Sequence, residues 1–311
     1  MYTSLSSRLP RPTHSRIALL FGLLAATNTA HAAVNVVTTT QDLAALTEAV
    51  GGTNVKVSFI ARGDMDPHFV DAKPSYMVKL AAADLVVSVG MELEVGWLPS
   101  LLTGARNPKV QPGAAGYLEA STVITPIEVP SGTMDRSRGD LHPQGNPHYW
   151  LDPENGRKVA RAIEAKLEAI DPAAAGAYKL NLANFEALLS AKEAGWMGAM
   201  APLNGAPVIG YHSTYDYFCA AYHLNVIGFV EPKPGIPPTP QHTLDLSAQA
   251  KQAGAKFILV EPYHNAADAG PIANASGAKT VTLPTSVGAS PEIKTYTDLF
   301  DAIVATLTSG S

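Results

Sequence analysis

The feature that most constrains the fold of this chain is a long helical stretch near its middle. Residues 173–200 contain no proline, and the glycines within them lie toward the two ends. A helix of about 28 residues spans about 42 Å, which is longer than one small domain needs. Because strand and helix signals alternate on both sides of this stretch, we interpret it as a rigid connector between two domains.

The segments before the long helix alternate between two kinds of pattern. Short runs of β-branched or apolar residues are typical of strands, and the segments between them have the spacing of helices. Nearly continuous apolar strands separated by helices indicate a parallel sheet covered by helices. The predicted strands are residues 34–40, 55–60 and 85–89, and the predicted helices are residues 43–50 and 73–83.

The same alternation restarts after the long helix, although no repeat is evident in the sequence itself. We therefore predict an α/β fold with two parallel-sheet lobes, joined by the long helix and separated by a cleft. The predicted strands of the second half are residues 208–211, 226–229, 257–260 and 280–283. The predicted segments are a signal peptide (1–32), an N-terminal lobe (33–171), the connecting helix (172–201) and a C-terminal lobe (202–311).

The first 32 residues have the pattern of a cleavable signal peptide. Three arginines precede an apolar run over residues 17–26, and the sequence Ala-His-Ala at residues 30–32 matches the small-x-small cleavage pattern. The apolar run is too short to span a bilayer. We expect export through this signal, and no cysteine follows the cleavage site to carry a lipid anchor.

Composition narrows the class of protein further. Cys219 is the one cysteine, so no internal disulfide can form. The net charge of −5 argues against nucleic acid or an anionic membrane as a partner. No segment after the signal approaches the 18 apolar residues of a transmembrane helix. A soluble periplasmic protein fits these observations best.

Three histidines occupy similar settings in the two predicted lobes. His68 and His148 each follow a proline, which stiffens the backbone before the ring, and His212 directly follows the strand predicted at 208–211. Ligands of open parallel sheets bind outside the carboxyl ends of the strands. Three imidazoles that converge on one cleft suit Zn²⁺, although imidazole also binds other first-row metals. An isolated histidine is more often a structural residue, so the weight of this hypothesis comes from the three together.

Four short motifs surround these histidines. They are residues 63–68 (GDMDPH), 146–153 (NPHYWLDP), 211–218 (YHSTYDYF) and 261–262 (EP). In this order they resemble the motifs of the cluster A-I solute-binding proteins of ABC transporters, the TroA-like zinc and manganese carriers. The resemblance covers essentially the whole mature chain.

The resemblance implies a fold, a set of ligands and a role. The fold is two four-stranded α/β lobes joined by one long helix, and the implied ligands are His68, His148 and His212. The implied role is capture of metal in the periplasm and delivery to an ABC permease, as a monomer that a metallochaperone could load. Relatives that prefer manganese usually have a carboxylate at the third position, so His212 favours zinc over manganese or iron.

The chain departs from this family at the fourth ligand. The family usually supplies an aspartate from the loop after the last strand, but residues 283–290 (LPTSVGAS) contain no carboxylate. Glu261, which ends the preceding strand, is the replacement that we favour. His264 or a water molecule could also complete the site, and Glu261 could instead be a buried structural carboxylate.

Two further features bear on this hypothesis. Residues 131–146 carry His142 as their one histidine, so we interpret this segment as a flexible lid, with metal capture as the alternative. Asp66 and Asp152 are candidate acceptors that would fix the tautomers of the neighbouring imidazoles.

The predicted chemistry is coordination without bond breaking, so we do not expect an enzyme. Three histidines with an open fourth position also hold catalytic zinc, and a zinc hydrolase with Glu261 as general base is therefore a rival hypothesis. A surface adhesion protein is a second rival, which the absence of a lipid-anchor cysteine disfavours.

Overall fold

The computed structural model describes residues 1–4, 32–131 and 142–309. Most of the predicted signal peptide (1–32) and most of the predicted lid (131–146) lie outside these residues. Within the described residues, no helix is both long enough and apolar enough to cross a membrane.

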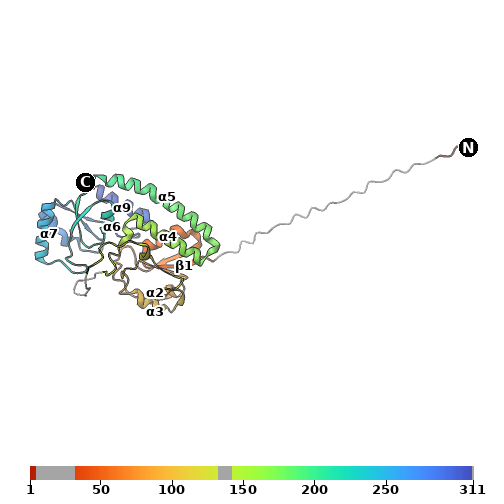
Figure 1. Ribbon diagram of the computed structural model, residues 1–311, viewed down its shortest axis with the longest axis horizontal. Helices are drawn as coiled ribbons and strands as arrows, with labels where there is room; N and C mark the ends of the chain where they lie inside the picture. The colour runs from red at the N-terminus through yellow and green to blue at the C-terminus, as the bar shows by residue number, and fades with distance from the viewer. Residues whose placement is uncertain (5–31, 132–141, 310–311) are drawn as a thin grey trace. The chain divides into compact units, whose positions relative to one another are not determined.

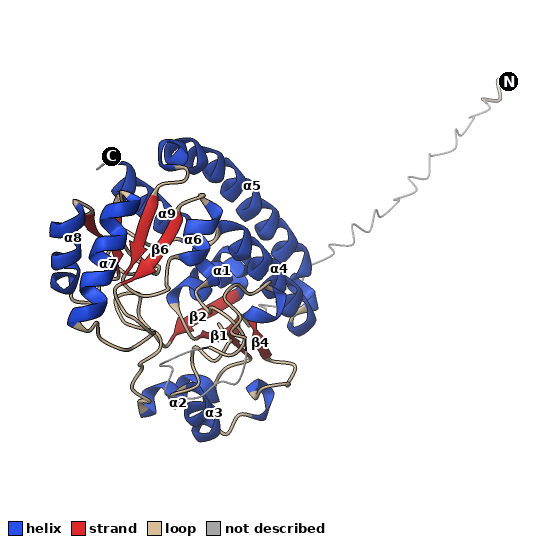
Figure 2. Cartoon of the chain, turned by 60° about the vertical axis from the view of Figure 1, so that its left-hand side comes forward, coloured by secondary structure: helices blue, strands red, loops and turns tan. Residues whose placement is uncertain are grey.

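Two parallel four-stranded sheets form the frame of the described chain (Figures 1 and 2). The first sheet contains β1 (Val34–Thr38), β2 (Val55–Phe59), β3 (Leu85–Ser88) and β4 (Tyr117–Glu119). The second contains β5 (Pro207–Gly210), β6 (Asn225–Phe229), β7 (Phe257–Val260) and β8 (Lys279–Thr282). Their orders, β2-β1-β3-β4 and β6-β5-β7-β8, are equivalent. The predicted α/β class with two parallel-sheet lobes is confirmed.

The first strand of each sheet lies between the second and the third. In the first sheet β1 pairs with β2 on one side and with β3 on the other, and β5 does the same with β6 and β7. The order in which the strands are added therefore reverses between β1 and β3 in the first sheet and between β5 and β7 in the second. Crevices at such points, outside the carboxyl ends of the strands, are where ligands bind in open parallel sheets.

Helices cover both sheets, and several of them begin where a polar side chain caps the backbone. Asp152 accepts a hydrogen bond from the backbone of Glu154 at the start of α4, and Thr295 forms a capping box with Asp298 at the start of α9. The helices are α1 (Gln41–Gly51), α2 (Pro74–Ala81), α3 (Leu98–Ala105), α4 (Pro153–Ile170), α5 (Ala175–Met200), α6 (Asp216–Ala221), α7 (Pro240–Ala253), α8 (Gly270–Ser276) and α9 (Tyr296–Thr308).

The long helix α5 is attached to both halves of the chain. It has 26 residues and packs against α1 and α4 before it in sequence and against α9 after it (Figure 1). Near its start the Asn181 side chain donates to the carbonyl of Val50, 3.0 Å away. Near its end the Trp196 indole donates to Asp301, 2.8 Å away. Helix α5 therefore connects the two lobes and packs against helices of both.

The inner faces of the two sheets share one hydrophobic core. Val87 of the first sheet and Leu259 of the second belong to the same buried cluster, together with Trp196 and Tyr296. Separate clusters lie on the outer faces, under α2 and α3 in the first lobe and under α7 and α8 in the second. Because interiors of proteins are close-packed, a large rotation of one lobe against the other would have to open this shared core.

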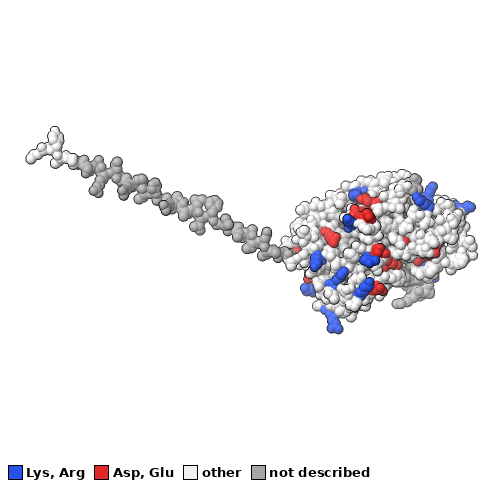
Figure 3. Space-filling model, turned by 180° about the vertical axis from the view of Figure 1, so that it is seen from behind, with Lys and Arg blue, Asp and Glu red and all other residues white. Residues whose placement is uncertain are grey.

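The charged side chains are mixed on the face seen in Figure 3. Lys and Arg side chains lie among Asp and Glu side chains there, and neither sign forms a single broad patch. Some of the described cations are paired: Arg157 with Glu154 and Glu193, and Arg161 with Glu186. This face offers no electrostatic footprint for a polyanion.

Candidate metal centre

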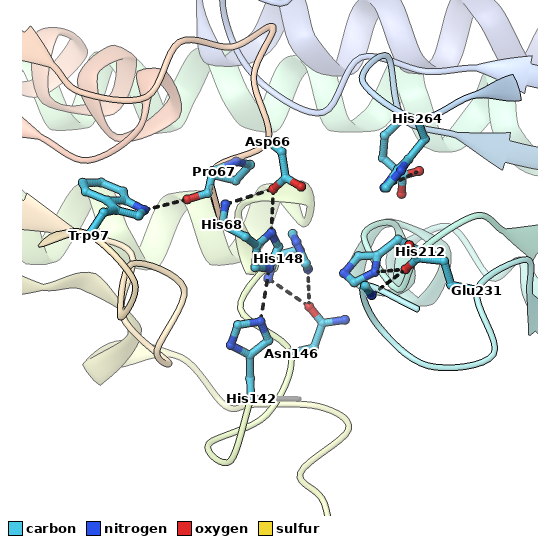
Figure 4. Close-up of polar contacts among 12 residues, drawn as sticks. Asp66, Pro67, His68, Trp97, His142, Asn146, His148, His212, Glu231 and His264 are labelled. Carbon is cyan, nitrogen blue, oxygen red and sulfur yellow. Dashed lines mark hydrogen bonds and ion pairs between the residues drawn. The ribbon is translucent and has the colours of Figure 1, made fainter. Parts of the chain in front are cut away.

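Three histidine rings meet between the two sheets (Figure 4). His68 lies in the loop after β2, His148 lies just ahead of α4, and His212 lies two residues after the end of β5. One ligand nitrogen from each ring lies within 4.8 Å of the others. The ring centroids are 5.2 Å apart for His68 and His148, 5.4 Å for His148 and His212, and 5.6 Å for His68 and His212. The structure thus brings together the three histidines that the sequence singles out.

The turn before His68 fixes the orientation of its ring. Asp66 Oδ1 accepts a hydrogen bond from the backbone N–H of His68 at 2.9 Å and lies 2.8 Å from Nδ1 of the ring. A carboxylate can only accept, so Nδ1 carries the proton and Nε2 keeps its lone pair. Burial raises the pKa of Asp66, but its bond to His68 and the charge of that ring outweigh this and hold the pKa below its usual value.

The turn before His148 repeats this arrangement with an amide. Asn146 Oδ1 accepts from the backbone N–H of His148 and lies beside Nδ1 of the ring, both at 2.9 Å. The Asn146 amide group is oriented by Nδ2, which donates to the carbonyl of Ser213 at 2.6 Å and to Glu128 at 3.1 Å. The Asn146 side chain therefore orients the His148 ring and connects the two lobes.

His148 has an unsatisfied ring nitrogen. The residue is 1% exposed, and its buried Nε2 has no hydrogen-bond partner among the described residues. Burial, with the nearby rings of His68 and His212, holds the pKa of His148 well below its usual value. The ring is neutral at neutral pH, and the lone pair of a buried, unpartnered nitrogen is available to a metal ion.

The third ring is oriented by a carboxylate from elsewhere in the chain. Nδ1 of His212 lies 2.9 Å from Glu231 Oε2, which also accepts from the backbone N–H of Gly235 at 3.0 Å. Glu231 follows β6, and both His212 and Glu231 are buried. His212 therefore also donates through Nδ1 and leaves Nε2 for a metal ion.

The expected role of Asp152 as an acceptor for a ligand ring is wrong. Its side chain instead caps α4 by accepting from the backbone of Glu154 at 2.9 Å. Asn146 takes that role because a side chain two residues before the ring can bond the backbone N–H and the imidazole at once. The expected role of Asp66 is confirmed by the same geometry in its own turn.

Glu261 lies at the end of β7 and is fully buried. Thr214 and the backbone of His212 lie beside its carboxyl group, but neither oxygen has a hydrogen-bond partner among the described residues. Burial raises the pKa of Glu261 to about 8. The group of described residues with ligand atoms within 4.8 Å of one another contains the three histidines and not Glu261. Its role as fourth ligand stays a prediction.

His264 lies at the side of the site that faces a small pocket. Its ring stacks on Tyr211 with centroids 4.3 Å apart, and its centroid is 6.4 Å from that of His212. Nε2 of His264 lies 4.0 Å from Glu261. The pocket is also lined by Asp66, His68, Phe69, His212, Glu231 and Tyr263. His68 and His212 therefore line the same pocket.

His142 lies closer to the three rings than its place in a predicted lid suggests. Its Nε2 is 3.1 Å from Nε2 of His68, and the two ring centroids are 5.2 Å apart. Desolvation and the nearby His68 ring lower the pKa of His142 to about 4. No spacing in the sequence could have indicated this contact, because 74 positions separate the two residues.

The loop that lacks the family's aspartate is bound to the first lobe. Asp42 at the start of α1 accepts from the backbone N–H of Val287 at 2.9 Å and from the hydroxyl group of Ser286. Trp150 donates through its indole N–H to the carbonyl of Thr285 at 2.8 Å. The loop therefore holds Trp150 in place, and the Trp150 ring in turn lies 5.4 Å from that of His148.

Comparisons with known proteins agree on one family. The family model described as "Zinc-uptake complex component A periplasmic" matches residues 36–310. The manganese ABC transporter substrate-binding lipoprotein PsaA of Streptococcus pneumoniae is 28% identical over 255 residues, which are 79% of this chain and 79% of that protein. The high-affinity zinc uptake system protein ZnuA of Yersinia pestis is 24% identical over 269 residues, 81% of this chain and 83% of that protein.

Solved structures share the fold over most of both lobes. A crystal structure of ZnuA has a TM-score of 0.75 at 24% identity and covers 89% of this chain and 99% of its own. A manganese-bound periplasmic metal-binding protein from candidatus liberibacter asiaticus has a TM-score of 0.73 at 18% identity, covering 89% of this chain and 98% of its own.

Proposed function

The chain belongs to the family of periplasmic substrate-binding components of metal ABC transporters, and from this premise we propose that it captures Zn²⁺ and delivers it to an importer in the inner membrane. The family consists of solute-binding transport components and not of enzymes. Periplasmic location, a monomeric state and loading by a metallochaperone belong to the same proposal.

The observation that carries the proposal is the common orientation of three imidazoles. In His68, His148 and His212 the Nδ1 atom is engaged by a protein acceptor, which leaves Nε2 of each ring to the ion. Acceptors on the outer nitrogen of a ligating histidine fix its tautomer and raise its basicity. We assign these three rings as ligands. For the fourth position the sequence offers Glu261, His264 or water.

The donor set favours zinc over manganese. Imidazole nitrogen suits zinc, whereas manganese prefers carboxylate, carbonyl and water oxygens. The carboxylates that lie nearest these rings, Asp66 and Glu231, accept from Nδ1 and therefore stand outside the ring of Nε2 atoms. They would offset part of the charge of the ion without binding it directly.

Binding in this site needs little rearrangement of the lobes. The shared core and helix α5 resist a large hinge motion, and the three ligand nitrogens already lie within 4.8 Å of one another. Two nitrogens on one tetrahedral zinc ion are about 3.4 Å apart. We therefore expect side-chain movements of about 1 Å when the ion binds.

Competition between metals on the metal-free protein tests this proposal. We expect one Zn²⁺ per chain and a preference for Zn²⁺ over Mn²⁺ and Fe²⁺, and His148→Ala should abolish tight binding. His223→Asn is a matched control, because His223 is exposed with a φ of 58° and asparagine tolerates that backbone. No binding of zinc by the wild-type protein would contradict the proposal.

A manganese carrier of the same family is the second candidate. The similarity to the manganese protein PsaA, at 28% identity, favours it. The same competition decides between them, because a preference for Mn²⁺ over Zn²⁺ at equal free concentrations would replace zinc as the proposed cargo.

A further inference from the structure

A fourth imidazole, that of His142, lies beside one of the three proposed ligands. Figure 4 shows the His142 ring below His68, joined to it by a dashed line between ring nitrogens. The two Nε2 atoms are 3.1 Å apart. On one tetrahedral zinc ion with bonds of about 2.0–2.1 Å, two such nitrogens would be about 3.4 Å apart. The observed separation is therefore close to that of two ligands on a shared ion.

The backbone of a second segment lies beside His142. It is that of Met91, in the turn that follows β3. Because Nε2 of His142 faces His68, an acceptor on this segment would engage Nδ1, as the acceptors of the three other rings do.

The turn that carries Met91 is constrained. Met91 and Glu92 have φ angles of 52° and 63°, a region that residues other than glycine rarely occupy. Buried Glu94 holds the turn, because its carboxyl oxygens accept from the backbone N–H groups of Val89 at 2.7 Å and Gly90 at 3.0 Å. Unusual backbone that is held in this way is common at ligand-binding sites.

His264 is less well placed than His142 for the fourth position. Glu261 and His142 both lie outside the group of described residues whose ligand atoms are within 4.8 Å of one another, so His142 would have to move toward His148 and His212 to join them. The His264 ring stacks on Tyr211 and its centroid is 6.4 Å from that of His212, compared with 5.2 Å between His142 and His68.

We propose that His142 is the fourth ligand of the bound zinc ion, in place of the carboxylate that residues 283–290 lack. This inference rests on the proposed function. It gives four imidazole nitrogen ligands, and the carboxylates of Asp66 and Glu231, which accept from the outer nitrogens of two rings, offset the charge of the ion. A site with four nitrogens and no oxygen bonded to the ion discriminates against Mn²⁺ more strongly than a site with a carboxylate.

X-ray absorption spectroscopy at the zinc edge counts the imidazoles directly. We would load the full chain with one equivalent of zinc and compare wild type, His142→Ala, His142→Gln, Glu261→Gln and the control His223→Asn. We expect four imidazole nitrogens at about 2.0 Å in wild type and in the control. Both His142 variants should keep three, with an oxygen in the fourth position, and a chelator competition should show an affinity roughly 100-fold lower.

The outcomes separate this inference from the proposed function. If wild type has three imidazoles and both His142 variants bind zinc as wild type does, the inference is overturned while the carrier proposal stands. Loss of zinc affinity in Glu261→Gln, with His142→Ala unaffected, would also overturn it and assign the fourth position to Glu261. Failure of wild type to bind zinc would remove both. Unchanged melting temperatures of the metal-free variants would show that they fold.

Discussion

The two lobes orient their ligand rings by different means. In the first lobe, His68 and His148 are each held by a side chain two positions earlier, across a proline, which bonds both the backbone N–H and Nδ1. In the second lobe, the acceptor for His212 is Glu231, which is 19 positions later in the chain. The first arrangement is local and the second depends on tertiary structure.

The difference has a physical basis in the backbone. Proline fixes its own φ, and Asp and Asn readily accept hydrogen bonds from a backbone N–H two residues on, so the Asx-Pro-His sequence forms its turn without help. Glu231 reaches His212 because β5 and β6 are neighbouring parallel strands, and beyond their ends the backbone N–H of Glu231 donates to the carbonyl of Tyr211 at 3.0 Å. Removing an acceptor should therefore have different consequences in the two lobes.

The largest effect is expected at Glu231. Glu231→Ala removes the acceptor of His212 and a negative charge, and nothing in the short turn of His212 replaces it. We expect zinc affinity to fall toward the upper end of the range of about 10–100-fold. Chelator competition measures this, and Glu231→Gln, which keeps an acceptor oxygen, should recover much of the loss. Equal affinities for Glu231→Ala and wild type would contradict the dependence on tertiary structure.

A smaller loss of affinity is expected at Asn146. Asn146→Ala removes the acceptor of the His148 ring, but dense packing around this fully buried side chain still restrains it. We expect a loss near about tenfold, and a lower melting temperature because the bond from Asn146 to Ser213 is lost as well. Asn146→Asp should restore the acceptor but lie close to Glu128, so its affinity should be intermediate. A larger loss of zinc affinity in Asn146→Ala than in Glu231→Ala would show that the first lobe depends more on its acceptor than the second.

Asp66→Asn should have a still smaller effect on zinc affinity. Asparagine keeps the acceptor oxygen and the local turn, so only the charge beside His68 is lost. We expect a decrease of less than about tenfold. Added salt should reduce this loss of affinity only slightly, because Asp66 is largely buried and screening acts mainly on exposed charges. A loss as large as that of His68→Ala would mean that Asp66 itself binds the ion.

Asp42 lies at the contact between the lobes and is not a proposed ligand, so its substitution should change stability without changing zinc affinity. Burial raises the pKa of Asp42 to about 7, above the value of about 3.9 expected in the unfolded chain. A raised carboxyl pKa stabilises the fold at low pH, and this contribution is lost as pH rises from about 4 through 7. Its slope is at most about 1.4 kcal/mol per pH unit.

Asp42→Asn should therefore flatten the fall in stability between pH 5 and pH 8. Asparagine can still accept from Val287 and bond with Ser286, so the contact itself should persist. Urea unfolding of metal-free protein measures the free energy of unfolding at each pH, and zinc affinity serves as the control that should stay near the wild-type value. An identical pH dependence in the variant and wild type would show that Asp42 does not titrate in this range.

The sequence predicts those parts of the fold that have a strong local pattern. The apolar strands and the long helix follow from periodicity, and α5 begins only two residues after the predicted start of the stretch 173–200. Strand β4 has three residues and α3 has eight, and neither was predicted, although α3 buries Leu98, Leu101, Leu102 and Ala105 at helical spacing. A segment this short takes its structure from the neighbours that it packs against.

In the candidate site, too, only contacts that depend on residues close in sequence could be predicted. Asp66, two residues before His68, was predicted as an acceptor, whereas the predicted acceptor Asp152 follows His148 and caps α4, and Asn146, two residues before that ring, takes the role. The contacts of Glu231 with His212 and of His142 with His68 could not be predicted, since the partners lie 19 and 74 positions apart in the chain.

A crystal structure of the zinc-loaded protein, with anomalous data at the zinc edge, tests the central claim most directly. We predict one zinc ion bonded to Nε2 of His68, His148 and His212, with each Nδ1 still facing Asp66, Asn146 and Glu231. A zinc ion bound through any Nδ1, bound away from these rings, or absent after exposure to excess zinc would contradict the account.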